Sequence, residues 1–376
     1  MRSRGPPVPH GTELLGGGKG RVGPPGPTER PVPEVDVALL SGFGFSCRPD
    51  CGLCCFASPR LDRDDETRLR AAAPKARVVL EGGERCVAAR PDGGACQFLD
   101  HLRCAVHAAR PAPCREFPVS VHIGTRLQAT VVLSCPGLHL EPLLSYSELG
   151  ATVRPSDLDA ELSAVRGRLT PAVERRRSES ERRRRRIARE LEEQGRWVAE
   201  EEVRQQLRVR HLIPAGDEYF PDEPPAVEEG LERLPMYYDG RAGPVVLAQG
   251  LGGWEAHELF PEGGSRPVGI AVPPDQPPTL DHDADAMLSG YLRYWLARDS
   301  FLAAVHLGML STRAGTVVDA ALDDLHAIGS DVLARGAVRA KLRGNVGARL
   351  SRADIEAGIR GTDQDWLDRP TWGSRL

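Results

Sequence analysis

The chain has 376 residues, of which 40% are hydrophobic, 27% are charged and 5% are aromatic, and its formal net charge is −4. This weak charge excludes a general electrostatic attraction to nucleic acids or anionic membranes. No stretch approaches the roughly 18 to 20 apolar residues that cross a bilayer, and the N-terminal region lacks the apolar core of a secretory signal. We therefore expect a cytoplasmic protein that makes no membrane contact and has room for two or three domains.

In chain order the sequence predicts four segments. Residues 1–35 hold 8 Pro and 8 Gly without hydrophobic periodicity, which is typical of a disordered leader. Residues 36–145 contain every cysteine and form the predicted metal-binding domain, which we call the cysteine-rich segment. Residues 146–213 form a charged helical connector, and residues 214–376 form a C-terminal α+β domain. The expected fold class is α+β: a small cysteine-rich domain with short β-hairpins, followed by a helical region with a small antiparallel β-meander.

Local patterns predict the elements within these segments. In the cysteine-rich segment we expect a helix over 62–73 and short strands over 77–80, 97–99, 105–107, 117–123 and 127–134. In the C-terminal domain we expect meander strands over 236–238, 245–248, 254–260 and 268–272. A helical region over 283–343 and a last helix from Ser351, capped by Asp354, complete the chain.

Arginine runs mixed with glutamate mark the connector between residues 175 and 193. Pro171 should divide the connector into two helices. Basic runs can bind nucleic acid or an acidic partner, but closely interleaved acids favour a solvated helix face with i,i+4 ion pairs. We favour the ion-paired face and do not expect binding of nucleic acid.

Nine cysteines lie before residue 136 and none follows it. They are Cys47, Cys51, Cys54, Cys55, Cys86, Cys96, Cys104, Cys114 and Cys135. In a reducing compartment such clustering favours metal ligands over disulfides. Four thiolates hold a zinc ion, and four also hold an iron–sulfur cluster such as 4Fe–4S. Eight cysteines would fill two such sites, and all nine could form one fused zinc cluster.

Two predicted hairpins would bring cysteines together in pairs. A two-residue turn at 124–125, with Gly first, would pair Ile123 with Arg126. If the same strand pairing continues outward, it sets Cys114 opposite Cys135. A three-residue loop likewise sets Cys96 opposite Cys104. Each hairpin would then present two thiols to a metal.

Other polar side chains accompany the cysteines. His101 and His107 are candidate substitute ligands. Arg110 and Arg115 flank Cys114, so they would offset the negative charge of a thiolate centre or donate hydrogen bonds to sulfur.

The spacing Cys47-x3-Cys51-x2-Cys54 is also that of radical S-adenosylmethionine enzymes, in which three cysteines leave one iron open. Leu53 stands where those enzymes usually carry an aromatic residue, and the repeated βα pattern of a barrel is missing. A radical enzyme therefore stays a minor alternative.

Five motifs follow one another between residues 43 and 140. They are Cys47-x3-Cys51-x2-Cys54-Cys55, Cys96-Gln-Phe-Leu, Cys104-Ala-Val-His, Arg110-Pro-Ala-Pro-Cys114-Arg-Glu-Phe-Pro118 and Cys135-Pro-Gly. Together they resemble the YkgJ-like cysteine-cluster family, whose domains chelate zinc or iron. The resemblance implies that the cysteines of these motifs are the metal ligands, and Cys86 fits the pattern least well.

That family includes flagellin lysine N-methylases. The resemblance therefore also implies a protein-lysine N-methyltransferase that uses S-adenosylmethionine and acts on a protein substrate. The chain lacks the glycine-rich strand–turn–helix that commonly holds this cofactor, and no catalytic residue is predicted. Two other functions stay open: a non-enzymatic zinc or iron module that binds a partner protein, and an electron-transfer protein.

Overall fold

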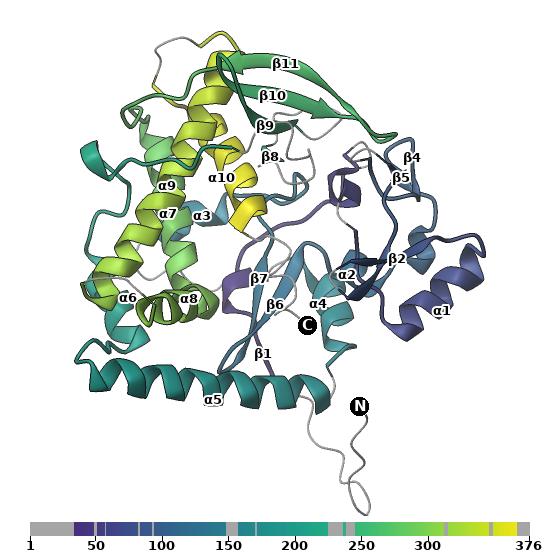
Figure 1. Ribbon diagram of the computed structural model, residues 1–376, viewed down its shortest axis with the longest axis horizontal. Coiled ribbons are helices and arrows are strands. Elements are labelled where there is room, and N and C mark those ends of the chain that lie inside the picture. The colour runs from purple at the N-terminus through teal and green to yellow at the C-terminus, as the bar shows by residue number, and fades with distance from the viewer. Residues whose placement is uncertain are drawn as a thin grey trace, which may run out of the picture. The chain divides into compact units, whose positions relative to one another are not determined.

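Helices and short sheets are mixed along the chain, as the α+β prediction requires (Figure 1). The computed structural model describes residues 34–48, 51–56, 58–81, 83–91, 94–147, 157–169, 171–224, 236–237, 245–311, 315–345 and 349–366. All of them belong to the unit Pro33–Leu376. The predicted leader lies outside the described residues, apart from Glu34 and Val35.

The cysteine-rich segment is built of short elements. They are β1 (Val35–Asp36), η1 (Ala38–Leu40), η2 (Leu53–Phe56), α1 (Arg63–Ala72), β2 (Val78–Glu81), β3 (Glu84–Val87), β4 (Leu99–Asp100), β5 (Arg103–Cys104), η3 (His107–Ala109), α2 (Ala112–Glu116), β6 (Val119–Ile123) and β7 (Leu127–Val131). The helix predicted over 62–73 is confirmed as α1. The Asp62 carboxylate caps this helix by accepting from the Asp65 N–H at 2.6 Å. Three small sheets have the orders β1-β7-β6, β2-β3 and β4-β5.

The hairpin β6–β7 exists, but its predicted register is wrong by one residue. Ile123 pairs with Leu127 rather than with Arg126, so the loop has three residues. The cause is tertiary, because Arg126 leaves the ladder to bind Asp36 at 2.6 Å and Asp299 at 2.8 Å. The ladder ends at Val119 and Val131, so it does not set the two flanking cysteines opposite each other.

The hairpin β4–β5 also differs from the prediction. Cys104 pairs with Leu99, not with Cys96, and the turn consists of His101 and Leu102, both with positive φ (43° and 60°). Leu99 and Leu102 pack closely against Gly52. A Cβ added at Gly52 would lie 3.4 Å from the Leu99 side chain and 3.3 Å from the Leu102 side chain. Packing against the first cysteine loop therefore decides the register.

The helix α3 (Pro142–Ser147) spans the end of the cysteine-rich segment and the start of the connector, which contains α4 (Asp159–Arg166), α5 (Pro171–Glu193) and α6 (Glu200–Arg208). Pro171 begins α5, as the sequence predicts. Arg177 pairs with Glu174 at 2.6 Å and with Glu181 at 3.7 Å, and Arg186 pairs with Glu190 at 3.8 Å. These are the predicted ion pairs along the helix face.

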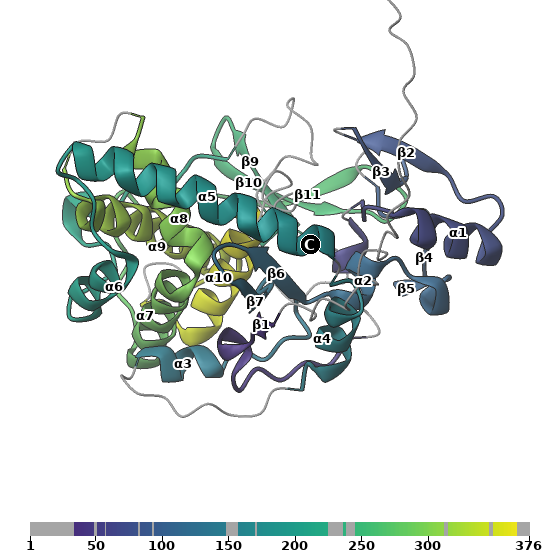
Figure 2. The ribbon, with the colours of Figure 1, turned by 90° about the horizontal axis from the view of Figure 1, so that it is seen from below.

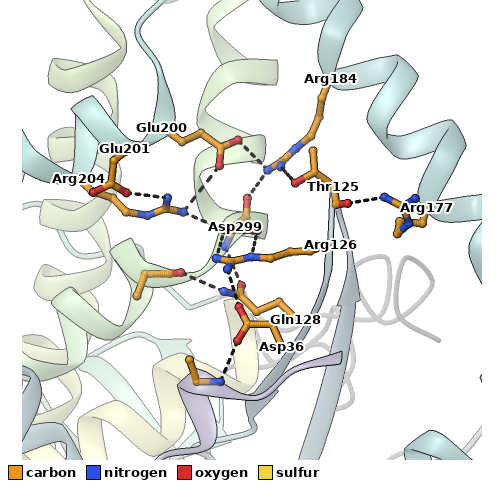
Figure 3. A network of polar contacts seen from close by, with 12 residues as sticks. Asp36, Thr125, Arg126, Gln128, Arg177, Arg184, Glu200, Glu201, Arg204 and Asp299 are labelled. Atoms are coloured by element: carbon orange, nitrogen blue, oxygen red, sulfur yellow. Dashed lines mark hydrogen bonds and ion pairs between the residues drawn. The ribbon is translucent and has the colours of Figure 1, made fainter. Parts of the chain in front are cut away.

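The helix α5 also holds the β6–β7 hairpin through a polar network, in which Arg177 takes part as well (Figure 3). Arg177 and Arg184 donate to the carbonyl and the hydroxyl of Thr125, at 2.7 and 3.2 Å. Asp299, the first residue of α8 (Asp299–Met309), accepts from Arg126 at 2.8 Å and from Arg204 of α6 at 2.9 Å. Asp299 is 5% exposed, and the network ties the β6–β7 hairpin to the three helices α5, α6 and α8.

The predicted meander is confirmed. It consists of β8 (Met236–Tyr237), β9 (Val245–Gly250), β10 (Gly253–Leu259) and β11 (Ser265–Ala271) in the antiparallel order β11-β10-β9-β8. One face enters the main core through Val245, Leu247, Trp254, Ala256 and Ala271. The opposite face carries Val246, Ala248 and Leu259, which pack against Phe56 of η2. One face of the meander thus packs in the main core, and its other face contacts the first cysteine loop through Phe56 (Figures 1 and 2).

The helical part consists of α7 (His282–Ala297), α8 (Asp299–Met309), α9 (Val317–Leu342) and α10 (Arg352–Trp366). Their apolar side chains share one core with β1, β6 and β7. Gly290 and Gly358 permit close approach, because a Cβ on either would overlap the carbonyl oxygen of Leu143 or Val332. In the part of the chain that the structure describes, no helix has the length and apolar character of a bilayer span.

Candidate metal centre

The first cysteine loop is shaped by a glycine. Gly52 has φ +62°, a conformation that side chains disfavour, and it directs the N–H of Leu53 to the sulfur of Cys51 at 3.4 Å. The N–H of Cys55 then donates to the Gly52 carbonyl at 2.9 Å and begins η2. Cys47 and Cys54 are exposed residues, and Cys51 and Cys55 are half-buried.

Cys96 lies directly against this loop. Its backbone N–H donates to the carbonyl of Cys55 at 2.6 Å. The N–H of Phe98 donates to the Cys96 sulfur, although burial of the thiol still raises its pKa. Cys104 follows on β5, whose partner strand packs at Gly52. The second and third motifs therefore meet the first one.

Cys114 lies in the short helix α2 rather than on a strand. Asp65 of α1, which is 2% exposed, accepts the N–H of Ala112 at 3.0 Å and so caps α2. At the other end of α2, Glu116 pairs with Arg168 at 2.8 Å. These contacts hold the Cys114 turn from both sides.

Cys135 follows β7 in a turn whose shape depends on Gly137. The Gly137 carbonyl accepts the N–H of Ser46 at 2.9 Å, and a Cβ at Gly137 would overlap the Ser46 carbonyl oxygen. This close approach places Cys135 next to the start of the first loop, one residue before Cys47. The N–H of Gly137 donates to the Cys135 sulfur, while burial raises the pKa of this thiol to about 12.

Arg360 of α10 holds the same turn from the opposite side. Its guanidinium donates to the carbonyls of Leu133 and Leu138, each at 3.0 Å, and also to the carbonyl of Cys135. Its charge opposes the rise in the pKa of Cys135. Nothing in the sequence pairs a residue 225 positions downstream with this turn, so sequence reasoning missed it.

Eight thiols interact with one another electrostatically, with Cys54 at the centre. The linked residues are Cys47, Cys51, Cys54, Cys55, Cys96, Cys104, Cys114 and Cys135. Cys55 donates a hydrogen bond to Cys54, which lowers the pKa of Cys54 and raises that of Cys55. Burial, followed by repulsion from Cys54, Cys96 and Cys104, raises the pKa of Cys114. Several thiolates can therefore form here together only with a compensating cation.

Arg110 supplies part of that positive charge, as predicted. It opposes the burial that raises the pKa of Cys47 and Cys114, and it lowers the pKa of Cys54. Arg115 has a different role, because it lies 3.6 Å from Asp65 and donates to the Arg110 carbonyl. It supports the α1–α2 junction.

The three remaining candidates are Cys86, His101 and His107. Cys86 lies in β3 opposite Val79 and is 3% exposed. His101 and His107 are exposed on the β4–β5 turn and on η3. Their role as ligands stays a prediction.

The donor chemistry fits a thiophilic metal. The backbone N–H of Leu53 donates to the sulfur of Cys51, and hydrogen bonds of this kind stabilise thiolates in metal sites. Among the described residues, no three His, Cys, Asp or Glu side chains stand close enough to hold one ion. Ligation therefore requires the thiols to rotate toward a common centre.

Comparison with known proteins gives one match. No curated protein and no solved structure matches the chain. Residues 46–136 match the family CxxCxxCC, described as "Putative zinc- or iron-chelating domain". The matched range holds all nine cysteines. The description names metal chelation and no reaction, so lysine methylation stays a prediction. The cysteine-rich segment of this chain thus matches the CxxCxxCC family of zinc- or iron-chelating domains.

Proposed function

We propose that the protein binds zinc or iron through thiolates of the cysteine-rich segment, with an iron–sulfur cluster as the first candidate and zinc as the second. The ligands are drawn from the eight linked cysteines, with Cys86 as a ninth candidate. When bound, the metal supplies the positive charge that lets neighbouring thiolates coexist, and an iron–sulfur cluster would also carry electrons.

The convergence of four cysteine-bearing stretches of chain supports this proposal: the loop at 47–55, the region at 96–104, the helix α2 and the turn after β7. The N–H of Cys96 donates to the carbonyl of Cys55 at 2.6 Å, and the N–H of Ser46 donates to the carbonyl of Gly137 at 2.9 Å. Unrelated buried cysteines have no reason to converge in this way. Binding would release protons, because metal-bound cysteines are thiolates.

Purification of the full chain without oxygen, followed by metal analysis and absorption spectroscopy, tests the proposal. A brown protein that contains iron and acid-labile sulfide would identify an iron–sulfur cluster. A colourless protein with stoichiometric zinc would identify a zinc centre and would refute the electron-transfer and radical alternatives. Purified protein that holds neither metal, and takes up neither on reconstitution, would refute the proposal.

A double substitution of Cys51 and Cys54 by serine provides the matched variant. We expect it to lose the bound metal, because serine is a poor ligand for soft metal ions. Substituting Cys86 by serine is the matched comparison. It tests whether Cys86, unlike the other eight cysteines, is dispensable for the bound metal. Retention of full metal content by the double variant would contradict the assignment.

A further inference from the structure

His257 of β10 is buried, yet neither of its ring nitrogens makes a hydrogen bond. It is 8% exposed, and both Nδ1 and Nε2 are shielded from solvent. A neutral imidazole offers one donor and one acceptor, and burying both without partners is costly. Such groups in folded proteins usually have a water or an ion as the missing partner.

The face of the meander that carries His257 is turned toward the first cysteine loop. Side chains alternate along β10, so His257 shares a face with Leu259, and its partner across β9 is Val246. Both residues belong to the small cluster against which Phe56 packs. Phe56 directly follows Cys55, so the strand face that carries His257 contacts the residue next to Cys55 through Phe56.

Glu255 lies on the same face, and its carboxylate faces one of the two ring nitrogens of His257. Its Oε2 is 3.4 Å from Nε2 of His257. A carboxylate against one ring nitrogen is the usual support of a metal-bound histidine, because it orients the ring and leaves the other nitrogen as the ligand. Here that nitrogen is Nδ1.

Further contacts hold β10 in this position. The Pro261 carbonyl, just beyond the strand, accepts the N–H of Ala95 at 3.1 Å and Nη1 of Arg90 at 3.1 Å. Ala95 precedes Cys96. The pairing of β10 with β11 shifts register between Ala256 and His257, and such bulges often occur where a strand aims a functional side chain.

We propose that Nδ1 of His257 is a ligand of the metal held by the cysteines, with Glu255 as the residue that positions its ring. The inference rests on the proposed metal centre and adds to it a ligand from a segment 120 residues beyond Cys135. Mixed cysteine and histidine ligands are common for zinc, and histidine also replaces cysteine in some iron–sulfur centres. Ligation requires His257 to move toward the sulfurs together with the thiols.

X-ray absorption at the zinc edge of the full chain, loaded with zinc, tests this directly. We expect a sulfur-rich shell with imidazole scattering in the parent protein. His257→Ala and His257→Gln should lose the imidazole signal and weaken zinc binding by 10- to 100-fold. His282→Ala, at an exposed histidine of α7, is the matched control and should keep both the signal and the affinity.

Glu255→Gln separates positioning from ligation. We expect it to keep the imidazole signal while zinc binding weakens, because the ring loses its charged partner. Imidazole scattering that persists in both His257 variants would overturn the proposal.

A shell of sulfur alone in the parent protein would also overturn it and would leave an ordered water as the partner of His257. Either result would leave the cysteine centre intact, whereas a chain that takes up no metal would refute the proposed function as well.

Discussion

The contact between α10 and the Cys135 turn yields the sharpest test of how the fold supports the metal centre. Arg360 donates to the carbonyls of Leu133 and Leu138 at 3.0 Å each, and to that of Cys135. Leu133 and Leu138 are 0% and 1% exposed, so their carbonyls have little access to water. Arg360→Met keeps much of the apolar stem but removes every donor.

The expected loss follows from the hydrogen bonds. A bond from a charged donor contributes about 1.5–3 kcal/mol, and bonds made by one group do not add fully. We expect Arg360→Met to lower the free energy of unfolding by about 3 kcal/mol. Because the Cys135 turn is no longer held, metal affinity should fall by about 10- to 100-fold, or roughly 1.4–2.7 kcal/mol.

Urea unfolding with a metal chelator present measures the first effect, and competition with a chelating dye measures the second. Arg352→Met on the same helix is the matched control. Arg352 pairs with Glu356 at 2.7 Å and Glu141 at 2.8 Å, but its side chain is 31% exposed, so its removal should cost less than about 1 kcal/mol. If the two variants unfold alike, or if Arg360→Met binds metal as the parent does, the reasoning is wrong.

Three further predictions concern other contacts. Gly137→Ala should destabilise the protein by about 1–3 kcal/mol in thermal or urea unfolding, because the Ser46 carbonyl must move; Gly252→Ala, where a Cβ has room, should be near neutral. Burial opposes ionisation of Asp299, but its arginine partners lower its pKa below the ordinary 3.8. It therefore stabilises the fold above that pH, and Asp299→Asn should reduce the loss of stability on acidification to about pH 3. Burial lowers the pKa of His306 in the folded state below 6.5. The neutral His306 side chain therefore contributes to the free energy of unfolding above pH 6.5, and this contribution is lost as the pH falls through the pKa of the folded state. In urea unfolding between about pH 7.5 and about pH 5, the free energy of unfolding of His306→Gln should change less with pH than that of the parent protein.

Local signals in the sequence were sufficient for much of the fold. Asp62 marks the start of α1, Pro171 the start of α5, and Asp354 caps α10 by accepting the N–H of Ser351 at 3.0 Å. The meander follows from alternating apolar residues and glycine turns. These features depend on contacts between near neighbours, so a reader of the sequence can find them.

The registers of the two hairpins were not readable in this way. The β4–β5 turn uses His101 and Leu102 at positive φ, where glycine or asparagine would be expected. The β6–β7 loop gains a residue because Arg126 binds Asp299. In both cases a partner distant in sequence outweighs the local turn preference.

The sequence by itself indicated that the cysteine-rich segment chelates a metal, because nine thiols with this spacing have few other uses. Only the tertiary structure decided how they meet: on a positive-φ turn at Gly52, on a helix capped by Asp65, and on a turn held by Arg360. It also brought the face of β10 that carries His257 against Phe56, the residue after Cys55. Ligand type is a property of single residues, whereas ligand geometry depends on long-range contacts that leave no local pattern in the chain.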